Sequence, residues 1–176
     1  MCFHSARSKS KINTNNELVD LKNQDRSQWY FPLVMLGDQA MHKAVGEQTD
    51  YSIYHYEAAI AAEHLQAKTF ESTNWKKILM WYEQLYELQP APITLLNMAV
   101  IHLQLNDLKN TIKLLQQITP NELEQRAYLF HGTMAEYFHK SEDPQKAIAQ
   151  LNQALDLVRN ESEKQFLLKK KEEWNI

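Results

Sequence analysis

Two stretches of the chain decide the fold: LNMAVIHLQLNDLKNTIKLLQQI at residues 96–118 and GTMAEYFHKSEDPQKAIAQLNQA at residues 132–154. Adding 36 to a residue number carries the first stretch onto the second, and small and apolar residues then recur at matching places. The matched pairs are Met98 and Met134, Ala99 and Ala135, Thr111 and Ala147, Leu115 and Leu151, and Ile118 and Ala154. A weaker copy, offset by 33 residues, lies upstream at Ile78, Tyr82 and Leu85.

A period of 33 to 36 residues with two helices in each unit is typical of tetratricopeptide-like repeats. We therefore predict an all-α fold, an α-α superhelix of three tetratricopeptide-like helix pairs over residues 52–158. An N-terminal helix with its connection precedes them over 27–51, and a capping helix follows over 159–176. Residues 1–26 are predicted to be mostly loop, and 1–176 to be a single domain.

Capping residues mark the ends of these helices. Asn74, Asp107 and Asn160 each stand where an N-cap is expected, and Thr119 with Glu122 has the spacing of a capping box. The predicted helices are Ser27–Val45, Ser52–Ala67, Trp75–Leu88, Pro92–Leu105, Leu108–Ile118, Pro120–Lys140, Pro144–Val158 and Glu161–Trp174.

Composition excludes several classes of protein. The 176 residues include three glycines, too few for a glycine-rich phosphate loop, and Cys2 alone cannot form an internal disulfide or a multi-cysteine metal site. A net charge of −3 gives no general attraction to nucleic acid. No apolar run reaches the length of a membrane span, and the first residues do not resemble a signal peptide, so we expect a cytoplasmic protein without a membrane partner.

An ordered series of motifs resembles one known family over essentially the whole chain. The motifs are Met1-Cys2-Phe3-His4-Ser5-Ala6-Arg7, Gln24-Asp25-Arg26-Ser27-x-Trp29, Tyr54-x-x-x-Ala58-Ala59-Ile60-Ala61-Ala62-x-His64, Trp75-x-x-Ile78, Tyr82-x-x-Leu85 and Leu96-Asn97-x-Ala99-Val100. In this order they resemble the C-terminal tetratricopeptide-like extension of bacterial extracytoplasmic-function RNA polymerase sigma factors. The chain departs from that family at Leu36, where an acidic residue is usual before the glycine.

The resemblance implies a non-enzymatic protein-interaction module that regulates transcription initiation through protein contacts. The implied partners are RNA polymerase, the promoter-binding domains of a sigma factor, or a regulatory protein. Neither a promoter-binding domain nor a basic recognition helix is found in this sequence. The expectation is therefore an isolated C-terminal module, either a natural truncation or a fragment, that does not bind DNA directly.

The alternative function is a helical domain that binds a small anionic ligand or acts as an enzyme. It would use a polar cluster made of His4, Arg7, Asp25, Arg26 and His64, since arginines bind anionic groups. The same cluster could instead be structural and pin the loop over residues 13–28 onto the helices. We expect no catalytic nucleophile, metal site or cofactor, because the remaining histidines are scattered and no nucleophile motif is present.

The concave face of the second helix pair is too apolar to face water, since it would carry Ile93, Leu96, Val100 and Leu103. We expect the helix Ser27–Val45 to cover it with its own apolar residues, and another protein chain is the alternative. Those apolar residues are Phe31, Leu33, Val34, Met35 and Leu36. The more polar face of the third pair would then stay open. There Glu136, His139 and Lys140 are the predicted partner-binding residues.

Overall fold

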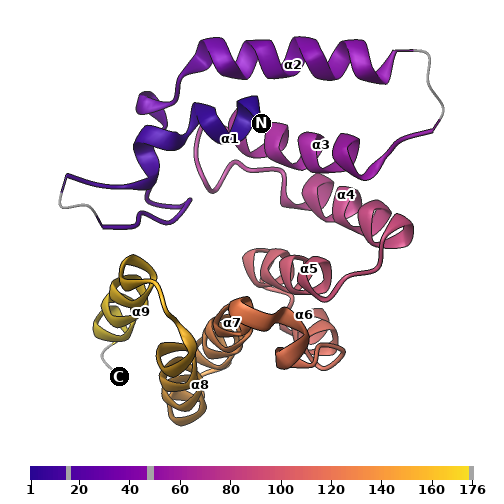
Figure 1. The fold of residues 1–176 in the computed structure, drawn as a ribbon. Helices are drawn as coiled ribbons and strands as arrows, with labels where there is room; N and C mark the ends of the chain where they lie inside the picture. Colours follow the sequence, from indigo (N-terminus) through magenta and orange to yellow (C-terminus); the bar gives the residue numbers. More distant parts are fainter. Residues whose placement is uncertain (15–16, 47–49, 175–176) are drawn as a thin grey trace. The chain divides into compact units, whose positions relative to one another are not determined.

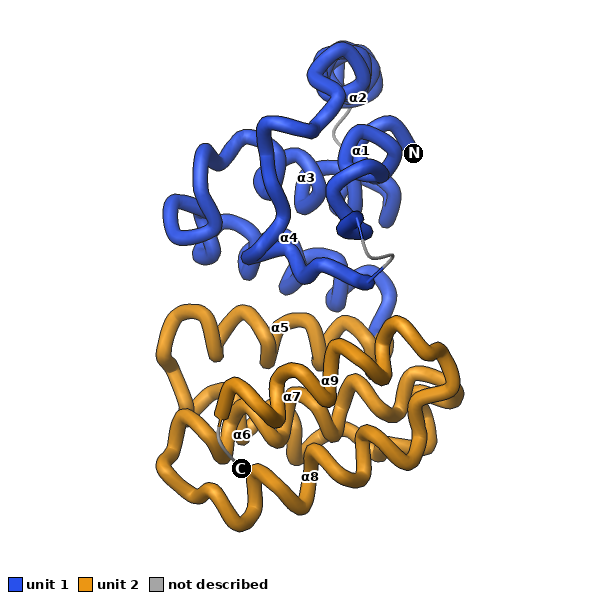
Figure 2. Tube along the Cα trace, turned by 90° about the vertical axis from the view of Figure 1, so that its left-hand side faces the viewer, with its two compact units in different colours: residues 1–90 blue, residues 91–176 orange. Residues whose placement is uncertain are grey.

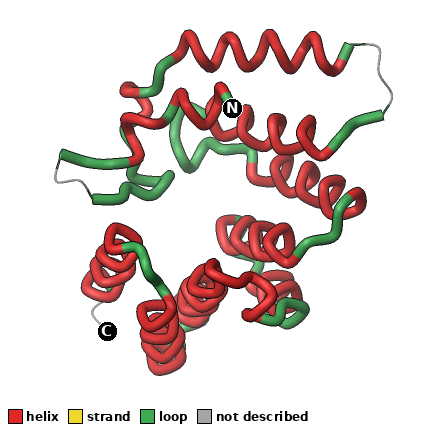
Figure 3. The backbone as a smooth tube through the Cα atoms, in the orientation of Figure 1, coloured by secondary structure: helices red, strands yellow, loops and turns green. Residues whose placement is uncertain are grey.

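The computed structural model describes residues 1–14, 17–46 and 50–174, and the parts of the predicted loop, connection and capping helix at 15–16, 47–49 and 175–176 lie outside them. The helices drawn in Figure 1 are α1 (Cys2–Ala6), α2 (Phe31–Val45), α3 (Ile53–Gln66), α4 (Trp75–Leu88), α5 (Pro92–Gln104), α6 (Leu108–Leu115), α7 (Ala127–Lys140), α8 (Pro144–Leu157) and α9 (Glu161–Glu173). The described residues also include the 3-10 segments η1 (Ser8–Lys11), η2 (Arg26–Gln28) and η3 (Pro120–Arg126). Within the described ranges the only extended pairing is an isolated bridge between Ile12 and Leu18, which confirms the all-α class (Figure 3).

The chain forms two compact units, residues 1–90 and residues 91–176 (Figure 2). Unit 1 contains α1 to α4, and unit 2 contains α5 to α9. Helices pair along the chain, α3 with α4 in unit 1, then α5 with α6 and α7 with α8 in unit 2. This pairing agrees with the predicted helical-repeat architecture. The single domain expected over 1–176 stays a prediction, and coincident unfolding of the two units would test it.

The turns inside the two pairs of unit 2 have the same geometry. Asn106 and Glu142, one repeat apart, both adopt a left-handed backbone with φ of 58° and 61°. The backbone N–H of the next residue, Asp107 or Asp143, donates to the previous helix at 2.8 or 2.9 Å. The same aspartate side chain then accepts a hydrogen bond from the first turn of the next helix. Each turn therefore ends one helix and starts the next.

The positions matched by the repeat period form the buried contacts of the pairs. Ala99 and Ala135 are fully buried on the first helices of the two pairs, and so are Thr111 and Ala147 on the second helices. Ile78, the equivalent residue of unit 1, is also fully buried. Because these positions have no free volume, they hold small or closely fitting side chains.

The helix α9 covers the last pair, as predicted. Its Leu167 is buried in a cluster with Ala135 and Leu151 of the helices below. Gly132 of α7 faces this contact, since a Cβ there would lie 3.9 Å from Leu167 Cδ2. At its C-terminal end α9 is tied down by Lys171, whose Nζ donates to Asn152 Oδ1 at 2.9 Å.

The core of unit 1 joins α1, α2 and α3. Phe3 and Ala6 of α1 pack in one buried cluster with Trp29 and Val34, and with α3 residues that include Leu65. The close approach of α1 requires Gly37 on α2, because a Cβ there would lie 2.5 Å from Phe3 Cε1. Residues 1–26 contain two short helical segments that the sequence did not predict, α1 and η1, while most of the other described residues in this range are loop or turn, as expected.

Two predicted helices differ most from the structure in their bounds, and each difference has a physical reason. The N-terminal helix begins at Phe31 rather than Ser27, since the preceding residues form η2 and Trp29 then becomes extended (φ −71°, ψ 135°). The helix predicted over Pro120–Lys140 is two elements, η3 and α7, because Glu124 interrupts it with φ of 51°. None of the described helices is both long enough and apolar enough to span a membrane.

Candidate functional site

Arg26 anchors the loop before α2 to the end of α3. Its Nη1 donates to the carbonyl oxygens of His64 at 2.8 Å and Ala67 at 2.6 Å. These carbonyls belong to the last turn and the C-cap of α3, where helix geometry leaves acceptors without backbone donors. This contact fits the structural interpretation of the polar cluster, in which it pins the loop over residues 13–28 onto the helices.

Two guanidinium groups lie against one tryptophan. The Cζ of Arg26 is 4.6 Å from the centroid of the Trp29 ring, and the Cζ of Arg7 is 6.0 Å from it. The indole is only 3% exposed, and its Nε1 donates to Ser10 Oγ at 2.9 Å. The ring is therefore held in place from α1 and η1 while it supports both arginines.

His64 faces the same cluster. Burial, then the charges of Arg7 and Arg26, lower the pKa of His64 to about 4. The pKa of Arg7 is also lowered, by burial and by the charge of Arg26. His64 is therefore neutral near pH 7, and the cluster holds two cations beside one neutral imidazole.

His4 and Asp25 do not join this cluster, which corrects the predicted set of five residues. Asp25 is exposed, and its Oδ1 accepts from the backbone N and the Oγ of Ser27 at 2.9 and 2.7 Å. These hydrogen bonds lower the pKa of Asp25 and make it the cap of η2. His4 is exposed on α1. The structure thus brings together Arg7, Arg26 and His64.

The predicted partner-binding residues of α7 all make contacts within unit 2. Glu136 Oε2 accepts from Lys170 Nζ of α9 at 3.0 Å. The ring of His139 stacks on Trp174, with centroids 4.2 Å apart and planes 4° from parallel. Lys140 Nζ donates to Leu103 O at 2.8 Å. These three residues hold neighbouring elements together, and their role in binding a partner stays a prediction.

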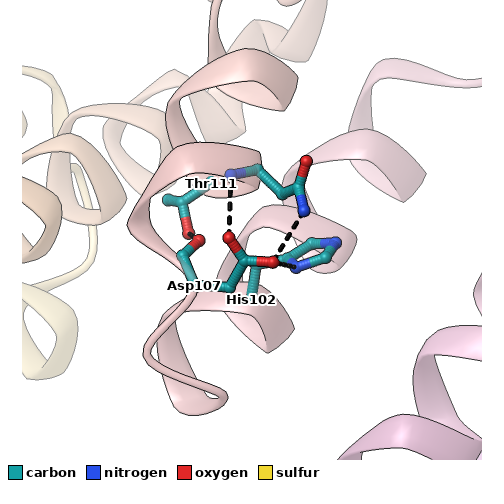
Figure 4. A network of polar contacts seen from close by, with 4 residues as sticks. His102, Asp107 and Thr111 are labelled. Carbon is teal, nitrogen blue, oxygen red and sulfur yellow. Dashed lines mark hydrogen bonds and ion pairs between the residues drawn. The ribbon is translucent and has the colours of Figure 1, made fainter.

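The structure confirms Asp107 as the predicted cap of α6, and shows a polar network around it that the sequence analysis missed (Figure 4). His102 Nδ1 lies 3.2 Å from Asp107 Oδ2, and Asn110 Nδ2 donates to the same oxygen at 2.6 Å. Thr111 Oγ1 donates to the backbone oxygen of Asp107 at 2.8 Å. Hydrogen bonds from Asn110, with a smaller effect of His102, lower the pKa of Asp107. The network caps α6. Within the described ranges no group of three His, Cys, Asp or Glu side chains could hold a metal ion.

The outward face of α2 is apolar. Phe31, Met35 and Leu36 are 56%, 62% and 53% exposed, although Val34 on the opposite face is buried. Within the described residues of unit 1 nothing covers these three side chains, and the expected packing of α2 on the second helix pair, which belongs to unit 2, stays a prediction. Phe31 and Met35 are neighbours one turn apart, and Leu36 is exposed beside them on the same outward side of the helix. We call these three residues the α2 patch.

A pocket of about 420 Å³ lies in unit 2 between the start of α5 and η3. Its lining residues are Pro92, Ile93, Glu122, Leu123, Glu124, Gln125 and Arg126. The side chain of Glu122 is already engaged, because it accepts from the backbone N of Thr119 at 3.2 Å. None of the predicted site residues lines this pocket.

Known proteins and protein families match parts of this chain. A family model described as a family of unknown function (DUF6596) matches residues 1–45, a stretch that includes Arg7 and Arg26 but ends before His64. An uncharacterized protein of Rhizobium meliloti (strain 1021) is 33% identical over 100 residues, which cover 57% of this chain and 23% of that protein. The match thus spans less than a quarter of the relative's length. No solved structure matches.

Proposed function

We propose that this chain is a non-enzymatic protein-interaction module of a bacterial sigma factor, acting in the cytoplasm. It would regulate transcription initiation through protein contacts rather than direct DNA binding. The proposed partners are RNA polymerase, the promoter-binding domains of a sigma factor, or a regulatory protein. The motif series from Met1 to Val100 supports the sigma-factor assignment by resemblance, and the helical-repeat architecture supports a binding role because such folds present extended surfaces to partners.

The α2 patch is the observation that carries the interaction role. Three large apolar side chains, each more than half exposed, stand together on one helix face. Contiguous exposed apolar surface of this kind marks protein–protein contacts in soluble proteins. Its centre is free of charge, as in the core of a typical interface, while His42 and Lys43 follow on the exposed side of the same helix.

The test is a binding titration of the purified chain against RNA polymerase core enzyme and sigma-factor promoter-binding domains from the same organism. We expect the Phe31→Ser, Leu36→Ser double variant to lose at least tenfold in affinity, because both changes remove apolar contact area. Leu157→Ser is the matched control, since Leu157 is 45% exposed in unit 2 and lies outside the patch. Equal binding by the original chain, the double variant and Leu157→Ser would contradict the proposal, and so would no binding to either partner.

Two further experiments test the proposed function. His139→Ala tests the predicted contact site on α7, and a loss of affinity there would assign the partner to unit 2 as well. A mobility-shift titration with promoter DNA should show no sequence-selective complex, because the chain carries a net charge of −3. Selective binding in the nanomolar range would overturn the protein-contact mechanism.

A further inference from the structure

The cluster around Trp29 contains more buried nitrogen atoms than hydrogen-bond partners. Arg7 Nε, Arg26 Nη2 and His64 Nδ1 are all shielded from solvent, and none of them has a hydrogen-bond partner. Buried polar atoms are nearly always paired in folded proteins, so three in one cluster call for an explanation. The three atoms come from Arg7, which lies between α1 and η1, from Arg26 of η2 and from His64 of α3.

The positive charges of the cluster also lack a compensating partner. Both arginines stack on one indole, so two positive charges stand close together. Among the described residues neither forms an ion pair with an acid. Asp25 is turned outward to cap η2, and Glu71, which acts electrostatically on Arg26, lies at the surface. Both arginines are partly buried, and cations withdrawn from water are normally compensated by a negative group in contact with them.

We propose that Arg7, Arg26 and His64 form a binding site for a small inorganic oxyanion, of the phosphate or sulfate type. The guanidinium fork suits oxyanions because its N–H groups are coplanar and evenly spaced. Arg7 Nε and Arg26 Nη2 would donate to two oxygens of the anion, and neutral His64 would donate from Nδ1. Because these three nitrogen atoms are shielded from solvent, the ligand would be a small ion.

Much of the site is already rigid. Two carbonyls hold Arg26 through Nη1, and its Nη2 has no hydrogen-bond partner. Ser10 holds the Trp29 ring, which both guanidinium groups approach. A donor set that is fixed before binding loses little conformational entropy when the anion enters. The bound ion would connect α1 to η2 and α3, so it would stabilise unit 1 in particular.

The experiment is equilibrium dialysis of the full chain against radiolabelled inorganic phosphate, with unlabelled sulfate as competitor. We expect saturable binding of one phosphate per chain, displaced by sulfate. Arg7→Lys keeps the charge but removes the Nε donor, and should weaken binding at least tenfold. Arg159→Lys is the matched control, because Arg159 is exposed in unit 2, and it should bind as the original chain does.

Three results would overturn the proposal. They are no saturable binding up to tens of millimolar phosphate, equal binding by Arg7→Lys and Arg159→Lys, and weak binding of many ions per chain, which would mean an adventitious ion only. In each case the buried nitrogens hold water rather than an anion. If Arg7→Lys does not fold, titration of the original chain followed by the Arg7 Nε–H resonance decides. A saturable shift of that resonance supports the site, and an unchanged resonance rejects it.

Discussion

The two helix pairs of unit 2 and the N-terminal region of unit 1 reach their structures in different ways. In unit 2 the left-handed turn residue, the aspartate cap and the buried small residues recur every 36 positions, so each pair is specified by its own sequence. In unit 1 the order comes from distant contacts, such as Arg26 with Ala67 and Trp29 with Ser10. Repetition makes local signals sufficient, and where it is absent the fold depends on a few polar and aromatic anchors.

The largest expected effect breaks the repeat in unit 2. Ala147→Phe should lower the free energy of unfolding by about 3 kcal/mol, because a fully buried alanine leaves no room for an aromatic ring. Ala149→Phe, on the exposed side of the same helix, should cost only about 0.5 kcal/mol of helix propensity. Urea unfolding of both variants makes the measurement. An unchanged midpoint for Ala147→Phe would contradict the 36-residue frame.

The next effect concerns the anchors of unit 1 and depends on pH. The pKa of His64 is lowered to about 4, below its unfolded value, so its contribution to stability is complete above about pH 6.5 and is lost as the pH falls toward 4. Between pH 7.5 and pH 5 we expect a loss of about 2 kcal/mol from this residue. His64→Leu should lack that slope. Denaturant titrations across this pH range compare the two proteins, and parallel curves would show that His64 is not buried in the folded state.

Alanine substitution of one glycine in each unit allows a direct comparison of the stability changes in the two units. Gly-to-Ala changes inside a helix usually stabilise it by about 1 kcal/mol. We expect Gly132→Ala to follow this rule, since its new Cβ would lie at ordinary contact distance from Leu167. Gly37→Ala should instead destabilise by about 1 kcal/mol, because the Cβ would collide with the Phe3 ring. Thermal melts give the sign. Stabilisation by both changes would mean that α1 does not pack on α2.

The smallest effect sharpens the account of the repeated turn. Glu142 has φ of 61°, a region that costs a side chain more than it costs glycine. Glu142→Gly should raise the free energy of unfolding by about 0.5 kcal/mol, after the greater freedom of glycine in the unfolded chain is subtracted. Ser141→Gly is the control, because Ser141 has a negative φ and should gain nothing. Equal stability changes in the two variants would show that this turn is not strained.

Helix boundaries in the repeats could be predicted because their signals are local. Trp75–Leu88 was predicted to the residue, since Asn74 caps its start and Pro90 stops the chain soon after its end. The helix α1 could not be predicted, because five residues are too few to show a helical period. Its packing against Gly37 is visible only in three dimensions.

The polar cluster was predicted only in part for the same reason. Arg7, Arg26 and His64 do meet, yet Asp25 takes the competing local role of capping η2. The sequence Asp25-x-Ser27 could have indicated this cap, because aspartate commonly accepts from the backbone two residues on. Asp107 was predicted as an N-cap, but its contact with His102 was missed. The two residues face each other across a turn whose left-handed residue, Asn106, carries a side chain rather than being glycine.

The way α9 is attached would allow an engineered helix pair to be inserted before it, which would lengthen unit 2. Below α9 lie Ala135, Leu151 and Ala154, small and apolar positions of the kind that each pair presents to its neighbour in the array. The linker at Val158 and Asn160 is short, and Asn160 restarts the helix by its own cap. A further 36-residue pair inserted at this junction would find a matching surface on one side and the displaced α9 on the other. The length of the array is thus an adjustable property of the chain, set by where α9 is placed.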